Sequence, residues 1–352
     1  MMALRHAQWC QRSHPLFWCR EVSAPRLQYS GRLTCASRCN STWGSASSFC
    51  LNTSGTPSIQ RLTPAVGAII YGVDLSDVSQ HKESAAIIYE ALLTHGVVFL
   101  KHQDKVNDDD IVKFAENFGS LEGPHPLYSP DPSSPLAVVA HDENNPPDGA
   151  EWHTDCSWSA SPPFSSVLWP KLLPSCGGDT LWLNSAKAFE TLDEKMKEDL
   201  RKLDAIHDMG SFRNSYVKKA RSSARNGSVS LEEQRLQAAA AIKEGFQEFG
   251  CAIHPVVKRH PITGKECLFV NECFTSHIVG LMSSESRQLL AFLFAHMQSP
   301  GLQCRWKWQL GDVALWDNRS TNHYASADYA GERRRMHRVT VLDDKLGAEV
   351  VA

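Results

Sequence analysis

Short apolar segments at irregular intervals restrict the fold of this chain more than any other feature of its sequence. Runs with strand character occur at residues 66–74, 97–100, 164–169, 177–182, 268–271, 312–316 and 338–342. Helical periodicity separates only some of these runs, near 82–95 and 108–118. Because a doubly wound parallel sheet requires regular alternation of strands and helices, the pattern argues against that fold. It predicts an α+β protein in which helices pack outside an antiparallel barrel or jelly roll.

One long segment between two predicted strands, residues 185–249, is charged and helical in character. A polar stretch at 221–228 interrupts it. Connections of this length are uncommon in compact domains, and they often carry or cover a binding site. We therefore expect a helical insertion close to the functional site.

The composition favours one large domain that follows a separate leader. The 352 residues are 42% hydrophobic and carry a formal net charge of -3, so the part from residue 58 to 352 can bury a full core. Lysines and arginines are scattered rather than arranged in a stripe, which argues against a nucleic-acid partner. No apolar run is long enough to span a bilayer, so no membrane partner is expected. We expect a small-molecule substrate, and the sequence leaves open whether the protein forms a homo-oligomer.

The first 57 residues differ in composition from the rest of the chain. They contain six arginines and many serines but one acidic residue, Glu21. This bias is typical of an organellar transit peptide and predicts a mitochondrial protein; if the leader is a disordered tail, a cytoplasmic location is the alternative. Five of the eleven cysteines lie in the leader, and the other six show no C-x-x-C spacing. Neither a zinc site nor a disulfide framework is indicated, in keeping with a reducing compartment.

Two copies of the pattern His-x-Asp raise the question of a metal site. His102 and Asp104 precede the acidic start of a predicted helix, so a solvated turn is the favoured interpretation there. His153 and Asp155 lie among strand-forming residues, in the stretch EWHTDCSW. We expect an extended conformation, in which side chains two residues apart share one face and can bind one ion.

The third ligand that such a pair needs is best supplied by His323, at the end of another predicted strand. Two histidines and one carboxylate from separate strands form the facial triad of non-haem Fe(II) oxygenases, which leaves one face of the metal open. A zinc-dependent hydrolase with the same number of ligands is one alternative. A catalytically silent binding module is another.

Several motifs occur in the order found in the 2-oxoglutarate-dependent taurine dioxygenase family, which the chain resembles from about residue 62 to 345. They are HTD, GGDTLW, LFVNECF, WDNRSTNHYASADY and RRRMHRVTVLDDK. The resemblance implies a double-stranded β-helix core, of the jelly-roll or cupin type, with flanking helices and a helical insertion. It also implies Fe(II), 2-oxoglutarate as cosubstrate and O2.

The resemblance assigns roles to the residues that match these motifs. The iron ligands would be His153, Asp155 and His323. Thr180 and Arg334 would hold the distal carboxylate of 2-oxoglutarate, a role that suits a hydroxyl donor and a planar guanidinium. By strand alternation Arg338 faces the same side as Arg334, and it would lie near both 2-oxoglutarate and the primary substrate.

The expected substrate pocket departs from the family pattern in part. His125 and Tyr128 match residues that contact taurine, and Phe274 matches an aromatic residue that lines the pocket. Cys156 stands where the family has an aliphatic residue, beside the carboxylate ligand, and is a candidate substrate contact. Gly149 stands where the family has an asparagine. These two departures bear on the identity of the primary substrate.

The implied reaction hydroxylates the carbon next to a sulfonate, with taurine or a related alkanesulfonate as the first candidate. The products would be succinate, CO2, sulfite and an aldehyde. The alternative substrates for the same chemistry are an aryloxyacetate, a sulfate ester or a betaine. We expect His125 to bind the anion best when it is protonated, so that affinity weakens as the pH rises through about 6.5.

Overall fold

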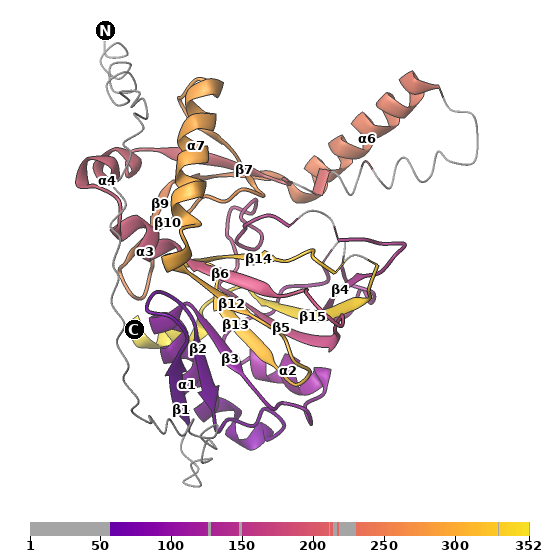
Figure 1. Cartoon of the computed structure of the whole chain (residues 1–352), viewed down its shortest axis with the longest axis vertical. Coiled ribbons are helices and arrows are strands. Elements are labelled where there is room, and N and C mark those ends of the chain that lie inside the picture. The colour runs from indigo at the N-terminus through magenta and orange to yellow at the C-terminus, as the bar shows by residue number, and fades with distance from the viewer. Residues whose placement is uncertain are drawn as a thin grey trace, which may run out of the picture. The chain divides into compact units, whose positions relative to one another are not determined.

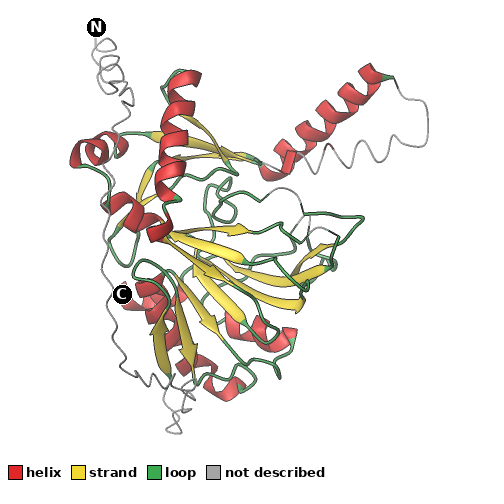
Figure 2. Ribbon diagram, in the orientation of Figure 1, coloured by secondary structure: helices red, strands yellow, loops and turns green. Residues whose placement is uncertain are grey.

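The computed structural model describes residues 57–351, apart from 126–127, 148–149, 211, 214–216, 218–229 and 330. The predicted leader up to residue 56, Gly149 and the polar stretch at 221–228 therefore lie outside the described residues. Figures 1 and 2 show the helices and strands of the described part. None of these helices is long and apolar enough to cross a bilayer.

A seven-stranded sheet forms the larger half of the core (Figure 1). Its strands lie in the order β1-β2-β3-β13-β5-β15-β4. Neighbouring strands are antiparallel except for β2 and β3, which are parallel. In chain order the strands are β1 (Ser58–Arg61), β2 (Ala68–Tyr71), β3 (Val97–Leu100), β4 (Ala137–His141), β5 (Ser165–Leu172), β13 (Val313–Asp317) and β15 (Arg334–Val341).

A smaller, three-stranded sheet packs against the larger one and completes the jelly roll. Its order is β12-β6-β14, with bounds β6 (Thr180–Asn184), β12 (Gln303–Trp306) and β14 (Thr321–Ala325). Phe99, Leu168 and Trp316 of the larger sheet pack in one buried cluster with Trp182 and Trp306 of the smaller. The rings of Phe99 and Trp306 stack with centroids 4.0 Å apart. This arrangement confirms the predicted α+β fold with a double-stranded β-helix core.

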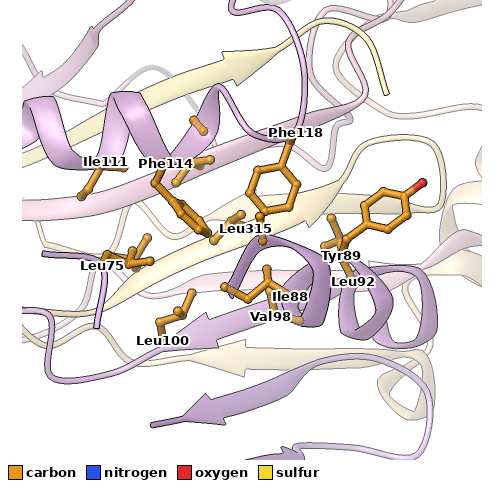
Figure 3. Packing of buried hydrophobic residues seen from close by; sticks show 14 of the residues in the cluster. Leu75, Ile88, Tyr89, Leu92, Val98, Leu100, Ile111, Phe114, Phe118 and Leu315 are labelled. Atoms are coloured by element: carbon orange, nitrogen blue, oxygen red, sulfur yellow. The ribbon is translucent and has the colours of Figure 1, made fainter. Parts of the chain in front are cut away.

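Two helices cover the outer face of the larger sheet, α1 (His81–His95) and α2 (Asp108–Ala115). Figure 3 shows Ile88 and Leu92 of α1 and Phe114 of α2 gathered against Val98 and Leu315 of the sheet. Apolar residues that recur at helical spacing give each helix one buried stripe, which fixes the face that it turns to the sheet. This second core supports the strands from outside and leaves their other face to the interior of the jelly roll.

The ends of these helices follow the local signals in the sequence. Gly96, with φ of 75°, ends α1 in the left-handed region that favours glycine. Asn107 and Asp110 form a capping box at the start of α2, and this confirms the predicted acidic helix start. The second helix is shorter than predicted because only turns continue from Glu116 to Phe118.

The segment 185–249 is only partly helical, contrary to the prediction. It contains α3 (Ser185–Glu190), α4 (Glu194–Leu200) and α6 (Leu231–Phe249), but also the strand β7 (Asp204–Asp208). This strand lies between β8 (Cys251–Pro255) and β11 (Thr275–Ile278) in an antiparallel sheet of three strands. Its partners come later in the chain, so local charge and periodicity did not reveal it.

The remaining elements complete the insertion and the C-terminal part. The hairpin of β9 and β10 ends at Leu268, earlier than the strand predicted for residues 268–271. Helix α7 packs against the cluster that also receives Leu183 of the smaller sheet. The bounds are η1 (Val78–Gln80), β9 (Val257–Arg259), β10 (Glu266–Leu268), α7 (Ser283–Met297), η3 (Pro300–Leu302) and α8 (Lys345–Val351).

Candidate active site

A cavity of about 740 Å³ lies where strands of both sheets of the jelly roll meet the insertion. Its lining includes residues of β6, β14 and β15, together with the loop before β5. Nine of the ten site residues predicted from the sequence line it: His125, Tyr128, His153, Asp155, Thr180, Phe274, His323, Arg334 and Arg338. Residues distant in the sequence are thus brought to one place, as a functional site requires.

The three predicted metal ligands form one compact cluster. His153 and His323 pair through two backbone hydrogen bonds, of 2.9 and 2.7 Å, and their ring centroids lie 4.1 Å apart. One ligand atom each from His153, Asp155 and His323 all lie within 4.8 Å of one another. That spacing is short enough for the three atoms to bind a single ion.

The backbone conformation at Asp155 differs from the extended strand that was predicted. Only His153 lies in a β-bridge, and a turn begins at Asp155. Cys156 has φ of 50°, an uncommon conformation for a residue with a side chain. The backbone therefore turns sharply, and the carboxylate reaches the metal position from this turn rather than along a flat strand.

Cys156 does not line the main cavity, contrary to its predicted substrate contact. Its buried side chain packs with Trp158 and Phe274, and its thiol lies 3.8 Å from an oxygen of Glu122. It lines a separate cavity of about 300 Å³. Burial and Glu122 raise the pKa of the thiol well above its usual value. A neutral, buried thiol is a packing group rather than a nucleophile.

Both histidines are prepared to bind a metal in the neutral form. The Nδ1–H of His153 donates to the carbonyl of Glu151 at 2.9 Å, which leaves Nε2 with its lone pair. Burial lowers the pKa of His153 and of His323. A neutral imidazole is the form that coordinates a metal. Nδ1 of His323 is buried and has no hydrogen-bond partner among the described residues.

The carboxylate of Asp155 is fully buried and is held ionised by its neighbours. Burial alone would raise the pKa of Asp155, but the charge of Arg338 and the hydrogen bond from Ser166 outweigh that effect and hold the pKa below its usual value. Nη1 of Arg338 donates to Oδ1 at 2.9 Å. The hydroxyl of Ser166 donates to Oδ2 at 2.6 Å. The donor set therefore has the charge and the protonation that an Fe(II) ion requires.

A second polar region of the cavity centres on Arg334, which is 3% exposed. Nε of Arg334 donates to the carbonyl of Gly178 at 3.2 Å, while Nη2 has no hydrogen-bond partner among the described residues. Burial lowers the pKa of Arg334, and Tyr329 only partly offsets this effect. A buried guanidinium with an unpaired donor needs an anion.

Thr180 and Gly178 shape the same region. The indole Nε1–H of Trp308 donates to the hydroxyl oxygen of Thr180 at 2.9 Å. The proton of that hydroxyl remains available to a ligand in the cavity. A Cβ at Gly178 would lie 3.1 Å from two side-chain atoms of Arg334, so the glycine leaves room for the arginine to extend.

Aromatic rings form another part of the cavity wall. Trp158, Phe212 and Phe274 lie with ring centroids 4.6 to 5.7 Å apart, and all three line the cavity. The ring of His125 lies 4.8 Å from that of Tyr128. Phe212 was not predicted as a site residue, because it belongs to the insertion and no local pattern distinguishes it from a packing residue.

The expectation that a protonated His125 binds the substrate anion is wrong. Burial, together with the charge of Arg338, lowers the pKa of His125 to about 3. The imidazole is therefore neutral at physiological pH, and its charge does not change near pH 6.5. The positive charge in this part of the cavity comes from Arg338 instead.

Acid should destabilise the protein because His125 and His207 are both buried in the neutral form. Burial lowers the pKa of each to about 3, whereas the unfolded chain binds a proton at about 6.5. The contribution of the two neutral histidines to the free energy of unfolding is complete above pH 6.5 and is lost as the pH falls toward 3. The loss at pH 5 should be on the order of 2 kcal/mol per histidine. Urea unfolding at pH 7 and pH 5 measures it, and a His207→Asn variant should lose less on acidification than the unaltered protein.

Comparison with known proteins identifies the family. The model of the "Taurine catabolism dioxygenase TauD, TfdA family" matches residues 58–340. The chain belongs to this family. It is 33% identical to the alkylsulfatase of Acinetobacter baylyi over 287 residues. The aligned region covers 81% of this chain and 85% of that protein.

Two further similarities within the TauD/TfdA family agree with this assignment. Identity is 32% over 279 residues to the alpha-ketoglutarate-dependent sulfate ester dioxygenase of Pseudomonas putida, covering 79% of this chain and 87% of that protein. A crystal structure of a taurine dioxygenase from Burkholderia xenovorans superposes with a TM-score of 0.63 at 28% identity, covering 82% and 90% of the two chains. The protein is thus a dioxygenase that depends on 2-oxoglutarate, the same compound as alpha-ketoglutarate.

The cofactors of the family are Fe(II), 2-oxoglutarate and O2, and the described residues fit them. Two neutral histidines and one ionised aspartate suit Fe(II), and the unpaired donor of Arg334 suits a carboxylate. When bound, iron and 2-oxoglutarate supply the oxidation of substrate by O2. The chain's own residues would bind and orient these groups.

Proposed function

We propose that this enzyme oxidises an organic sulfonate or sulfate ester, and that Arg338 binds the anionic group of the substrate. For a sulfonate, hydroxylation at the carbon next to sulfur gives sulfite and an aldehyde, together with succinate and CO2 from the cosubstrate. The proposal is supported by the names of the relatives, which include a sulfate ester dioxygenase and a taurine dioxygenase. Taurine is one candidate within this class, because a similar solved structure is that of a taurine dioxygenase.

The observation that carries the proposal is the position of Arg338. Its Nη1 is engaged by Asp155, but its Nε is buried and has no hydrogen-bond partner among the described residues. It lines the cavity together with His125 and Tyr128. A sulfonate or sulfate oxygen is a strong acceptor that would satisfy the free N–H, and it stays ionised throughout the physiological pH range.

The roles proposed for the two arginines are separate. Arg334 and Thr180 would hold the distal carboxylate of 2-oxoglutarate, since both donors face the same polar region. Arg338, with His125 and Tyr128, would face the primary substrate. The neutral His125 would act there as a hydrogen-bonding group and not as a cation.

The aromatic wall favours a substrate that has an apolar carbon chain as well as an anionic group. Trp158, Phe212 and Phe274 offer ring surface to the cavity. Cavities of a few hundred Å³ and more hold drug-sized ligands, so about 740 Å³ has room for 2-oxoglutarate and a substrate larger than taurine. Longer alkanesulfonates and alkyl sulfates are therefore the candidates to compare with taurine.

Succinate release from a panel of substrates tests the proposed function. The panel contains taurine, longer alkanesulfonates, alkyl sulfate esters, aryloxyacetates and betaines, each with Fe(II), 2-oxoglutarate and air. We expect sulfonates or sulfate esters to stimulate succinate release above the level without substrate, with matching release of sulfite or sulfate. Stimulation by an aryloxyacetate or a betaine alone would retain the dioxygenase and reject this substrate class.

A further inference from the structure

We propose that Ser166 is a positioning residue that keeps the iron-binding carboxylate of Asp155 bound through one oxygen. Ser166 lies on β5 and is fully buried, as is Asp155 apart from 3% of its surface. Its hydroxyl donates to Oδ2 of Asp155 at 2.6 Å. A hydrogen bond from a neutral hydroxyl to a buried carboxylate is short and strong.

The two oxygens of Asp155 face different partners. Oδ1 lies 4.0 Å from Nε2 of His323 and also accepts the hydrogen bond from Arg338. Oδ2 points to Ser166. Oδ1 is therefore the oxygen that lies next to Nε2 of His323, and Ser166 binds the other oxygen.

Binding through one oxygen matters because of the number of positions that the reaction needs. A metal ion held by one atom from each of three residues would keep its remaining positions for 2-oxoglutarate and O2. A carboxylate that binds through both oxygens would take one of these positions. Ser166 opposes that rotation, since Oδ2 would have to give up its hydrogen bond.

The direction of the hydrogen bond from Ser166 is itself fixed by Asn318. The indole of Trp316 can only donate, and its Nε1–H lies 2.8 Å from Oδ1 of Asn318. The amide nitrogen of Asn318 must then face Ser166, where it donates to Oγ at 3.2 Å. Because Oγ accepts that bond, the single proton of the hydroxyl is directed to Asp155.

Asn318 also ties together the segments that carry the ligands. It lies in the turn between β13 and β14, and β14 carries His323. The hydroxyl of Thr154, which stands between His153 and Asp155, donates to the carbonyl of Asn318 at 2.6 Å. The chain of hydrogen bonds from Trp316 to Asp155 thus connects β13, the turn before β14 and β5 to one of the proposed metal ligands.

The proposal is tested without turnover by measuring Mn(II) binding to the full chain and to its variants. Electron paramagnetic resonance of the free ion follows the binding. Ser166→Ala should weaken Mn(II) binding by about 10- to 100-fold, the usual effect of removing a group that orients a ligand. Ser165→Ala is the matched control. Ser165 is adjacent and 1% exposed, and its hydroxyl donates at 2.8 Å to the carbonyl of Trp316 rather than to a ligand. Its Mn(II) affinity should stay within about twofold of the unaltered protein.

A second variant guards against misfolding of Ser166→Ala. Ser166→Cys nearly preserves the shape of the side chain but has only a weak S–H donor, so it should give an intermediate loss of Mn(II) affinity. Urea unfolding of all three variants separates loss of stability from loss of binding. Unchanged Mn(II) affinity in Ser166→Ala and Ser166→Cys, or an equal loss in Ser165→Ala, would overturn the proposal. Neither result depends on the identity of the primary substrate.

Discussion

Replacing Asp155 with alanine should reduce turnover to that of the metal-free protein. The variant loses the carboxylate of the His153, Asp155 and His323 cluster and with it the negative charge that balances the metal. Succinate release with Fe(II) and 2-oxoglutarate measures the loss of activity, and Mn(II) titration measures the loss of the metal. Asp104→Ala provides the control, since Asp104 belongs to the other His-x-Asp pattern and is exposed in a turn.

Loss of stability must be separated from loss of the metal in this experiment. Alanine leaves the guanidinium of Arg338 buried without its partner, and breaking a buried ion pair in this way costs about 3 to 5 kcal/mol. Asp155→Asn keeps the volume and an acceptor for Arg338, so it should fold more stably while still failing to support turnover. Full activity in Asp155→Ala and Asp155→Asn would show that Asp155 is not a metal ligand.

The general architecture was predictable because it depends on a pattern that many residues share. Short strands at irregular spacing predicted the jelly roll, and the capping box at Asn107 and Gly96 predicted helix ends. The metal cluster was predictable for another reason. His153 and His323 lie in motifs that resemble those of the family. They could therefore be matched to the family's iron ligands without knowledge of which residues contact each other in the fold.

Features set by non-local contacts were predicted less well. The strand β7 pairs with β8 and β11. Even the nearer of these in the sequence, β8, begins more than forty residues after β7 ends. The turn at Cys156 and the low pKa of His125 depend on what surrounds them in the folded protein. Burial of an imidazole cannot be read from neighbouring residues, and so the charge of His125 was predicted incorrectly.

The hydrogen bonds around the ligands show the same limitation. Ser166 appeared in the sequence as one serine in an apolar strand, and Asn318 as one residue of a long motif. Their importance follows from a chain of contacts between β5 and the turn before β14. An alternating strand pattern places Ser166 on one face, but only the fold places Asp155 opposite it.

Replacing Arg334 with lysine should raise the concentration of 2-oxoglutarate that the enzyme requires. Lysine retains the charge but lacks the planar fork that can donate two parallel hydrogen bonds to a carboxylate. The expected loss is about 1.5 to 3 kcal/mol, or about 10- to 150-fold in affinity, as for a hydrogen bond to a charged group. Lysine would also lose the contact of Nε with the carbonyl of Gly178.

The dependence of succinate release on 2-oxoglutarate concentration measures this effect, and the neighbouring Arg335 provides the control. Arg335 is exposed on the same strand and does not line the cavity, so Arg335→Lys makes the same replacement on β15 without altering the site. We expect the 2-oxoglutarate requirement to rise for Arg334→Lys and to stay constant for Arg335→Lys. If the 2-oxoglutarate requirement of Arg334→Lys is unchanged, the role of binding the distal carboxylate would be assigned to Arg338 instead. Its Nε is also a buried guanidinium donor that has no hydrogen-bond partner among the described residues. In that case Arg338→Lys should raise the requirement instead, and the anionic group of the primary substrate would need a different donor.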